Sequence, residues 1–100
     1  MSRFAVYVLP GAWQEIKDLP GHMRQRVRRA VDGLALDPRP PRSTGLEVAD
    51  IGFEVRRLRL DRWRILYALD TEDRTIDVLA VRRRPPYDYG DLEELLAQMD

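Results

Sequence analysis

The residues best suited to chemistry are arginines, which gather in two short stretches of the sequence. Residues 53–67 read FEVRRLRLDRWRILY and contain five of them, Arg56, Arg57, Arg59, Arg62 and Arg64. A second cluster, Arg82, Arg83 and Arg84, is followed by Pro85-Pro86-Tyr87-Asp88-Tyr89. A guanidinium group keeps its charge and binds phosphate through two parallel hydrogen bonds. The clusters therefore favour binding to a polyanion.

The charge of the whole chain conceals this pattern. The formal net charge is zero, with 17 basic and 17 acidic residues, and Lys17 is the only lysine. Residues 88–100 contain five acidic residues and no basic one. Binding to a polyanion depends on local potential, so a neutral total is compatible with a basic face.

Composition excludes several classes of site. The chain has no cysteine, so disulfides and thiolate metal sites are ruled out, and His22 is its only histidine. A Ser-His-Asp triad and a histidine-based zinc site are therefore disfavoured, and we expect no metal and no cofactor. No apolar run approaches membrane-spanning length, and residues 1–9 lack the pattern of a signal peptide. We expect one domain over residues 1–100, located in the cytoplasm.

Periodicity and turn residues predict the elements that must position the arginines. Met23, Val27, Ala30, Val31 and Leu34 form one apolar stripe of a helix over residues 23–36. The proline-rich residues 37–45 predict a loop. The other expected elements are strands over residues 4–9, 46–48, 53–60, 63–69 and 75–81 and helices over residues 12–19 and 91–99.

The two strands on either side of Asp61-Arg62 carry the first arginine cluster. In a regular strand, Phe53 and Val55 would point to one face and Leu58 and Leu60 to the other. We therefore expect a β-bulge near Arg56-Arg57. The strand over residues 63–69 is apolar on both faces except at Arg64, which predicts a central strand. A charge flanked by buried positions is costly unless it is paired or functional.

These elements together predict an α+β fold. A small antiparallel, mixed-edge β-sheet of about four strands packs on an N-terminal helical hairpin, and a short C-terminal helix follows.

The order and motifs of the chain resemble the RelE/ParE superfamily of bacterial toxin–antitoxin toxins. Trp63-Arg64-Ile65-Leu66-Tyr67 resembles the family's aromatic-Arg-apolar-apolar-Tyr strand. Val81-Arg82-Arg83-Arg84 followed by Tyr87 is similar to its closing valine, basic pair and tyrosine. The resemblance covers nearly the whole chain. It implies a type II toxin that cleaves messenger RNA in the ribosomal A site, inhibits translation and is neutralised by a cognate antitoxin.

The same resemblance implies roles for individual residues. Arg64, Arg84 and Tyr87 correspond to catalytic positions, and Tyr89 competes with Tyr87 because the Pro-Pro insertion shifts the alignment. The predicted RNA-binding residues are Arg56, Arg57, Arg59, Arg62, Arg83 and Tyr89, of which Arg56 and Arg57 lie where RelE-like members have lysines. Arginine is a poor general base because it does not lose its proton near neutrality. The base is therefore Glu54, Glu47, a tyrosine or a group outside this chain.

Two other functions remain open for a chain of this kind. One is a ParE-like toxin that binds DNA gyrase, and the other is an inactive member of the fold that only binds its antitoxin. Retention of Arg64, Arg84 and Tyr87 favours the nuclease, whereas the absence of lysine from the site favours the alternatives. An acidic antitoxin segment that folds on binding could cover an exposed arginine surface. The alternative is that the acidic C-terminal helix of the same chain covers it.

Overall fold

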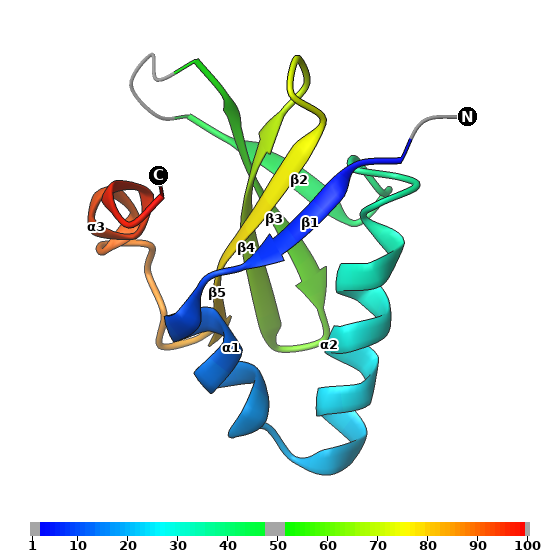
Figure 1. Ribbon diagram of the computed structural model, residues 1–100. Helices are drawn as coiled ribbons and strands as arrows, with labels where there is room; N and C mark the ends of the chain where they lie inside the picture. Colours follow the sequence, from blue (N-terminus) through cyan, green and yellow to red (C-terminus); the bar gives the residue numbers. More distant parts are fainter. Residues whose placement is uncertain (1–2, 48–51, 100) are drawn as a thin grey trace.

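A five-stranded sheet forms the centre of the protein, as Figure 1 shows for the computed structural model, which describes residues 3–47 and 52–99. The strand order is β1-β5-β4-β3-β2. β1 runs parallel to β5, and all other neighbours are antiparallel. The elements are β1 (Ala5–Val8), α1 (Pro10–Lys17), α2 (Gly21–Gly33), β2 (Ser43–Leu46), β3 (Glu54–Leu60), β4 (Trp63–Asp70), β5 (Thr75–Arg83) and α3 (Leu92–Ala97).

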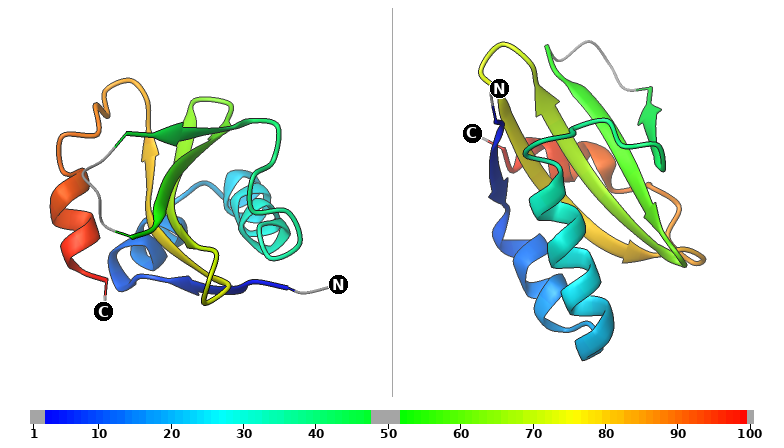
Figure 2. Two further views of the ribbon diagram at one scale, coloured as in Figure 1. Left: turned by 90° about the horizontal axis from the view of Figure 1, so that it is seen from above. Right: turned by 90° about the vertical axis from the view of Figure 1, so that its right-hand side faces the viewer.

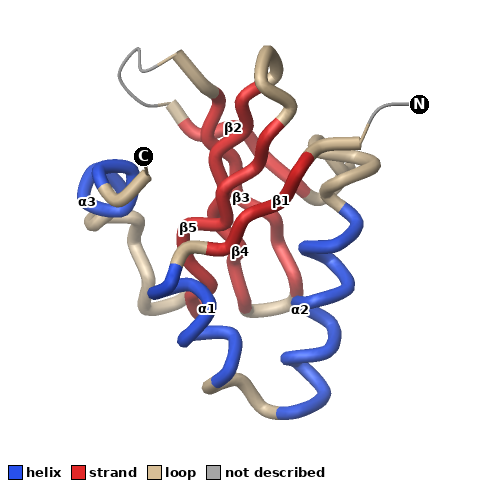
Figure 3. The backbone as a smooth tube through the Cα atoms, viewed as in Figure 1, coloured by secondary structure: helices blue, strands red, loops and turns tan. Residues whose placement is uncertain are grey.

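The two faces of the sheet are covered by different helices, as Figures 2 and 3 show. On one face, the α1–α2 hairpin packs against side chains such as Leu58, Ile65 and Tyr67. On the other face, Leu95 of α3 packs against a smaller cluster that includes Leu66 and Leu79. Burying an aliphatic side chain of this kind contributes about 1.5–3 kcal/mol, so the larger cluster supplies most of the driving force for folding. The predicted α+β sheet on a helical hairpin is confirmed, with five strands rather than about four.

The central strand is β4, as the apolar character of both its faces predicts. Residues 65–69 are all buried, with Ile65, Tyr67 and Leu69 on the α1–α2 side and Leu66 and Ala68 on the α3 side. The Tyr67 hydroxyl donates a 2.7 Å hydrogen bond to the Pro38 carbonyl, so the polar end of this buried ring is satisfied.

The predicted bulge at Arg56-Arg57 is wrong. The pairing of β3 with β4 runs without a shift from Glu54 opposite Leu69 to Leu60 opposite Trp63. The apolar residues change face along β3 for another reason. The first half of the strand buries Val55 on the α3 side of the sheet, whereas the second half buries Leu58 under the α1–α2 hairpin. The only register shift recorded for the described strands lies between Leu66 and Tyr67 of β4 in their pairing with β5.

Element boundaries differ from the predictions where proline and sequence-distant pairing decide them. α1 begins at Pro10, because a proline at the first helical position loses no hydrogen bond and has a suitable φ. β2 begins at Ser43, inside the predicted loop, because residues 43–46 pair with β3. The strand predicted at residues 46–48 therefore ends at Leu46 in the described chain. Val48, the last residue of that predicted strand, lies outside the described residues.

Two kinds of feature are missing from the described part of the chain. None of its helices is long and apolar enough to cross a membrane. Across residues 3–47 and 52–99, no three acidic, cysteine or histidine side chains gather closely enough to hold a metal ion.

Candidate nucleic-acid interface

An open hollow lined by arginines lies at the end of the sheet that contains the β3–β4 turn. Its volume is about 660 Å³. The lining residues are Pro41, Arg42, Thr44, Arg57, Arg59, Asp61 and Arg64. They come from the proline-rich loop, β2, β3, the β3–β4 turn and β4, so the hollow exists only in the folded sheet. We call it the first hollow.

The pleat of the sheet sends Arg57, Arg59 and Arg64 into the first hollow. Side chains alternate along a strand, so Arg57 and Arg59 share the face of β3 opposite to Leu58. Arg59 stands directly across from Arg64, and Arg64 in turn stands across from Arg82 of β5. Like charges directly opposite each other destabilise a sheet. These opposed arginines are therefore better suited to bind an anion than to stabilise the sheet.

Eleven of the 16 arginines fall into two groups by their partners. Arg26, Arg39, Arg56 and Arg82 form ion pairs with carboxylates. Among the described residues, no carboxylate pairs with the arginines at positions 42, 57, 59, 62, 64, 83 and 84. They lie in the loop before β2, on β3, in the β3–β4 turn, on β4 and at or directly after the end of β5, and we call these seven the unpaired arginines. Their uncompensated charge gives this end of the sheet a strong local potential.

Arg64, which was predicted to be catalytic together with Arg84, lies on β4, and Arg84 directly follows the neighbouring antiparallel strand β5. The Arg64 guanidinium donates to the backbone carbonyls of Asp61 (3.0 Å) and Trp63 (2.9 Å), so no carboxylate neutralises it. The Arg84 amide donates to the Arg62 carbonyl at 2.7 Å, which continues the pairing past the end of β5. Both side chains thus retain their charge at the same end of the sheet.

Tyr89 joins Arg57 to Arg84. Its hydroxyl oxygen accepts a hydrogen bond from Arg57 at 3.1 Å and another from Arg84 at 3.3 Å. Both guanidinium carbons also lie near its ring, 5.6 and 5.2 Å from the centroid. Burial opposes ionisation of this phenol, but the hydrogen bonds from Arg57 and Arg84 outweigh it, so the pKa of Tyr89 is lowered from its usual value. Arg57 and Arg84 therefore favour the ionised form of Tyr89 relative to an ordinary tyrosine.

Tyr87 has the opposite environment. Burial and a hydrogen bond from its hydroxyl to Asp91 raise the pKa of Tyr87 far above the usual value. Asp91 also accepts from Arg82 at 2.8 Å, and Arg82 forms a second ion pair with Glu15 of α1. This cluster connects α3, β5 and α1. The Tyr87 hydroxyl thus makes a structural contact, and Tyr89 is the tyrosine that contacts Arg57 and Arg84.

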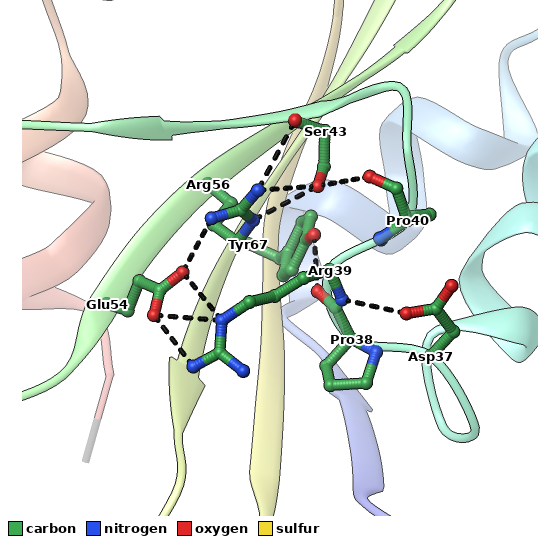
Figure 4. A network of polar contacts seen from close by, with 8 residues as sticks. All are labelled: Asp37, Pro38, Arg39, Pro40, Ser43, Glu54, Arg56 and Tyr67. Carbon is green, nitrogen blue, oxygen red and sulfur yellow. Dashed lines mark hydrogen bonds and ion pairs between the residues drawn. The ribbon is translucent and has the colours of Figure 1, made fainter.

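Glu54 and Arg56 lie on the α1–α2 side of the sheet and do not line the first hollow. Figure 4 shows the network of polar contacts that they form. Glu54 pairs with Arg39 at 2.9 Å and with Arg56 at 2.7 Å, and Arg56 also donates to the Ser43 hydroxyl. Hydrogen bonding from Arg39, opposed by burial and reinforced by Arg56, lowers the pKa of Glu54. The structure thus does not bring Glu54 or Arg56 together with the other site residues, and a weakly basic carboxylate is a poor proton acceptor. Glu47 is exposed after the end of β2.

Glu54→Gln is expected to lower the free energy of unfolding near pH 7 by about 1 kcal/mol, because Arg56 is largely buried and loses its charged partner. A carboxyl whose pKa is lowered by folding stabilises the protein above its unfolded pKa of about 4.3. That contribution disappears as the pH falls through the folded pKa. Urea unfolding of both proteins should show the difference near pH 7 and little difference near pH 3. An equal difference at both pH values would contradict the ion-pair explanation.

The remaining predicted RNA-binding residues, Arg62 and Arg83, do not line the first hollow. They line a neighbouring hollow of about 580 Å³, here called the second hollow, together with Met23, Arg59, Asp61 and Trp63. The sequence reasoning missed Arg42 and Thr44, which belong to the predicted loop. Only the pairing of β2 with β3 brings them to the site, as in the register of Thr44 opposite Arg57.

Fold and site together define a small α+β protein with an open, arginine-rich surface at one end of its sheet. The sequence model of a family described as "ParE toxin of type II toxin-antitoxin system, parDE" matches residues 6–85. The chain belongs to this toxin family, within the RelE/ParE superfamily. No curated protein sequence matches the chain.

Solved structures of RelE proteins share the fold. The archaeal RelE–RelB complex from Pyrococcus horikoshii matches with a TM-score of 0.76 and 22% identity over 85% of this chain and 99% of that chain. The toxin–antitoxin complex RelBE2 from Mycobacterium tuberculosis matches with a TM-score of 0.69 and 24% sequence identity, over 82% of this chain and 99% of that chain. The isolated RelE toxin of E. coli matches with a TM-score of 0.67 and 14% sequence identity, over 95% of this chain and 97% of that chain. At these identities the likeness concerns the fold.

Proposed function

We propose that this toxin is a ribosome-dependent mRNA endoribonuclease that inhibits translation. The observation that carries the proposal is the set of unpaired arginines, four of which line the first hollow. Two of the set, Arg57 and Arg84, donate to Tyr89. A protein leaves this much charge uncompensated at a cost in self-repulsion, and a phosphate backbone relieves that cost.

Cleavage of RNA by its own 2′-hydroxyl needs a base and positive donors around the phosphate. In the proposed reaction Tyr89, as its phenolate, takes the proton of the 2′-hydroxyl. The 2′-oxygen then attacks phosphorus, the bond from phosphorus to the 5′-oxygen breaks, and the leaving oxygen takes a proton from solvent. Arg57 and Arg64 bind the non-bridging oxygens, where charge accumulates in the transition state. Arg84 assists by holding down the pKa of Tyr89.

An antitoxin and the ribosome are the proposed partners. Two of the similar solved structures are complexes of RelE-type toxins with their antitoxins, which supports an antitoxin for this chain. An acidic, partly disordered segment is the kind of partner that would neutralise the unpaired arginines. On the ribosome, the same arginines would contact messenger RNA in the A site.

A gyrase-binding toxin is the second candidate, and one observation favours it. The matching family model is that of the ParE toxin rather than a RelE toxin. In that case the unpaired arginines would form a protein contact and Tyr89 would carry out no proton transfer.

A brief induction of the toxin in cells distinguishes the two. The nuclease proposal expects translation to stop within minutes and cut messages to appear on ribosomes, whereas purified mRNA without ribosomes stays intact. Primer extension on ribosome-bound messages is the measurement. Intact messages accompanied by DNA damage and filamentation would replace the nuclease with the gyrase-binding toxin.

A further inference from the structure

The second hollow lies beside the first, on the other side of the β3–β4 turn. Arg59 and Asp61 line both hollows, so the two adjoin at the turn. The second hollow adds Arg62 and Arg83, two of the unpaired arginines, to Met23 and Trp63. Arg83 stands directly across from Trp63 in the pairing of β4 with β5.

The chemistry of the second hollow differs from that of the first. Trp63 is half-buried and packs on the main core, so its ring is held in place while part of it faces the hollow. Met23 is 6% exposed and supplies a second apolar surface. Asp61, the acidic residue of the lining, is paired with Arg26 of α2. An aromatic ring beside two uncompensated guanidinium groups is the arrangement that binds a nucleotide, with the base on the ring and the phosphate on the cations.

We propose that the second hollow is a nucleotide subsite for the same RNA strand, next to the nucleotides cleaved in the first hollow. The base stacks on Trp63, and Arg62 and Arg83 bind the adjoining phosphate. Arg59 lies at the boundary, where it contacts the phosphate between the two hollows. This subsite rests on the proposed nuclease function and extends it, because it assigns the substrate as a single strand that passes around the β3–β4 turn.

An acidic protein segment is a weaker occupant than RNA. A carboxylate would pair with Arg62 or Arg83, but it has no planar ring that could stack on Trp63. Stacking on an aromatic face is available to every base and is worth about 1–3 kcal/mol, so one subsite of this kind raises affinity without fixing sequence.

Tryptophan fluorescence tests the subsite directly, because the chain has only two tryptophans. In Trp13→Phe, Trp63 is the sole reporter. The probes are 2′-O-methyl RNA oligonucleotides, which lack the attacking hydroxyl and cannot be cleaved, as a dinucleotide and a tetranucleotide. We expect the tetranucleotide to quench Trp63 and to bind about tenfold more tightly than the dinucleotide.

Variants of the two arginines complete the experiment. In Arg62→Ala/Arg83→Ala, made in the same Trp13→Phe protein, the advantage of the tetranucleotide should disappear. The slope of log affinity against log salt should fall by about 0.7 for each lost phosphate contact. Arg24→Ala on the exposed side of α2 removes a charge outside both hollows and should leave quenching and the length effect unchanged.

Three results would overturn the subsite. The first is unchanged Trp63 emission at saturating tetranucleotide, and the second is a length effect that survives loss of both arginines. The third is stronger quenching by an oligoglutamate peptide than by the oligonucleotide, which would assign the hollow to a protein. None of these results bears on whether messages are cut on ribosomes, so the nuclease function succeeds or fails separately in the induction experiment.

Discussion

Replacing Tyr89 by phenylalanine is expected to slow message cleavage on ribosomes by about 100- to 10,000-fold, the usual contribution of a positioned general base. The substitution keeps the ring between Arg57 and Arg84 and removes only the oxygen to which both donate. Single-turnover cleavage of a message in the ribosomal A site measures the effect. Thermal unfolding of the variant confirms that the fold is intact.

The matched control is Tyr87→Phe. It removes a hydroxyl that contacts Asp91, so we expect reduced stability and a cleavage rate within severalfold of the unmodified protein. If Tyr87→Phe abolished cleavage and Tyr89→Phe did not, Tyr87 would be the functional tyrosine and the assignment made from the hydrogen bonds would be wrong.

The dependence of the rate on pH follows from the same assignment. A general base works only when deprotonated, so the single-turnover rate should rise about tenfold per pH unit and level off at the pKa of Tyr89. That pKa lies below the ordinary tyrosine value of about 10, because the hydrogen bonds from Arg57 and Arg84 outweigh the effect of burial. Arg84→Ala should move the plateau to higher pH, and Tyr89→Phe should remove the rise altogether.

Loss of the Arg64 guanidinium is the second large effect. Arg64→Ala is expected to lower the single-turnover rate by about 100- to 1,000-fold, as for other preorganised donors to a developing negative charge. Arg64→Lys restores the charge but not the planar fork, so it should recover only part of the rate. Growth arrest on induction should weaken most in Arg64→Ala and less in Arg64→Lys.

The control for Arg64→Ala is Arg24→Ala, which removes the same charge from the exposed side of α2. Equal losses in the two variants would mean that cleavage depends on total charge and not on the first hollow. Binding of the antitoxin by Arg64→Ala and its thermal unfolding should be measured as well, since an intact fold is required for the comparison.

The sequence alone was sufficient for the elements whose signals are local. The apolar stripe of α2 and the two apolar faces of β4 depend on residues a few positions apart, and both were predicted correctly. The arginine clusters were equally visible, since β3 and β4 are adjacent in sequence and in the sheet. These signals, with their order along the chain, were enough to indicate the family.

Only the tertiary structure decided which arginines belong to the site. Arg56 and Arg57 are neighbours in sequence, yet the pleat directs them to opposite faces of β3. Arg56 is neutralised there by Glu54 beside Arg39 of the proline-rich loop, whereas Arg57 faces the first hollow and contacts Tyr89. Likewise, Asp91 engages Tyr87 and leaves Tyr89 to the arginines. Charge is a property of each residue, but its neutralisation depends on side chains that packing brings from distant positions.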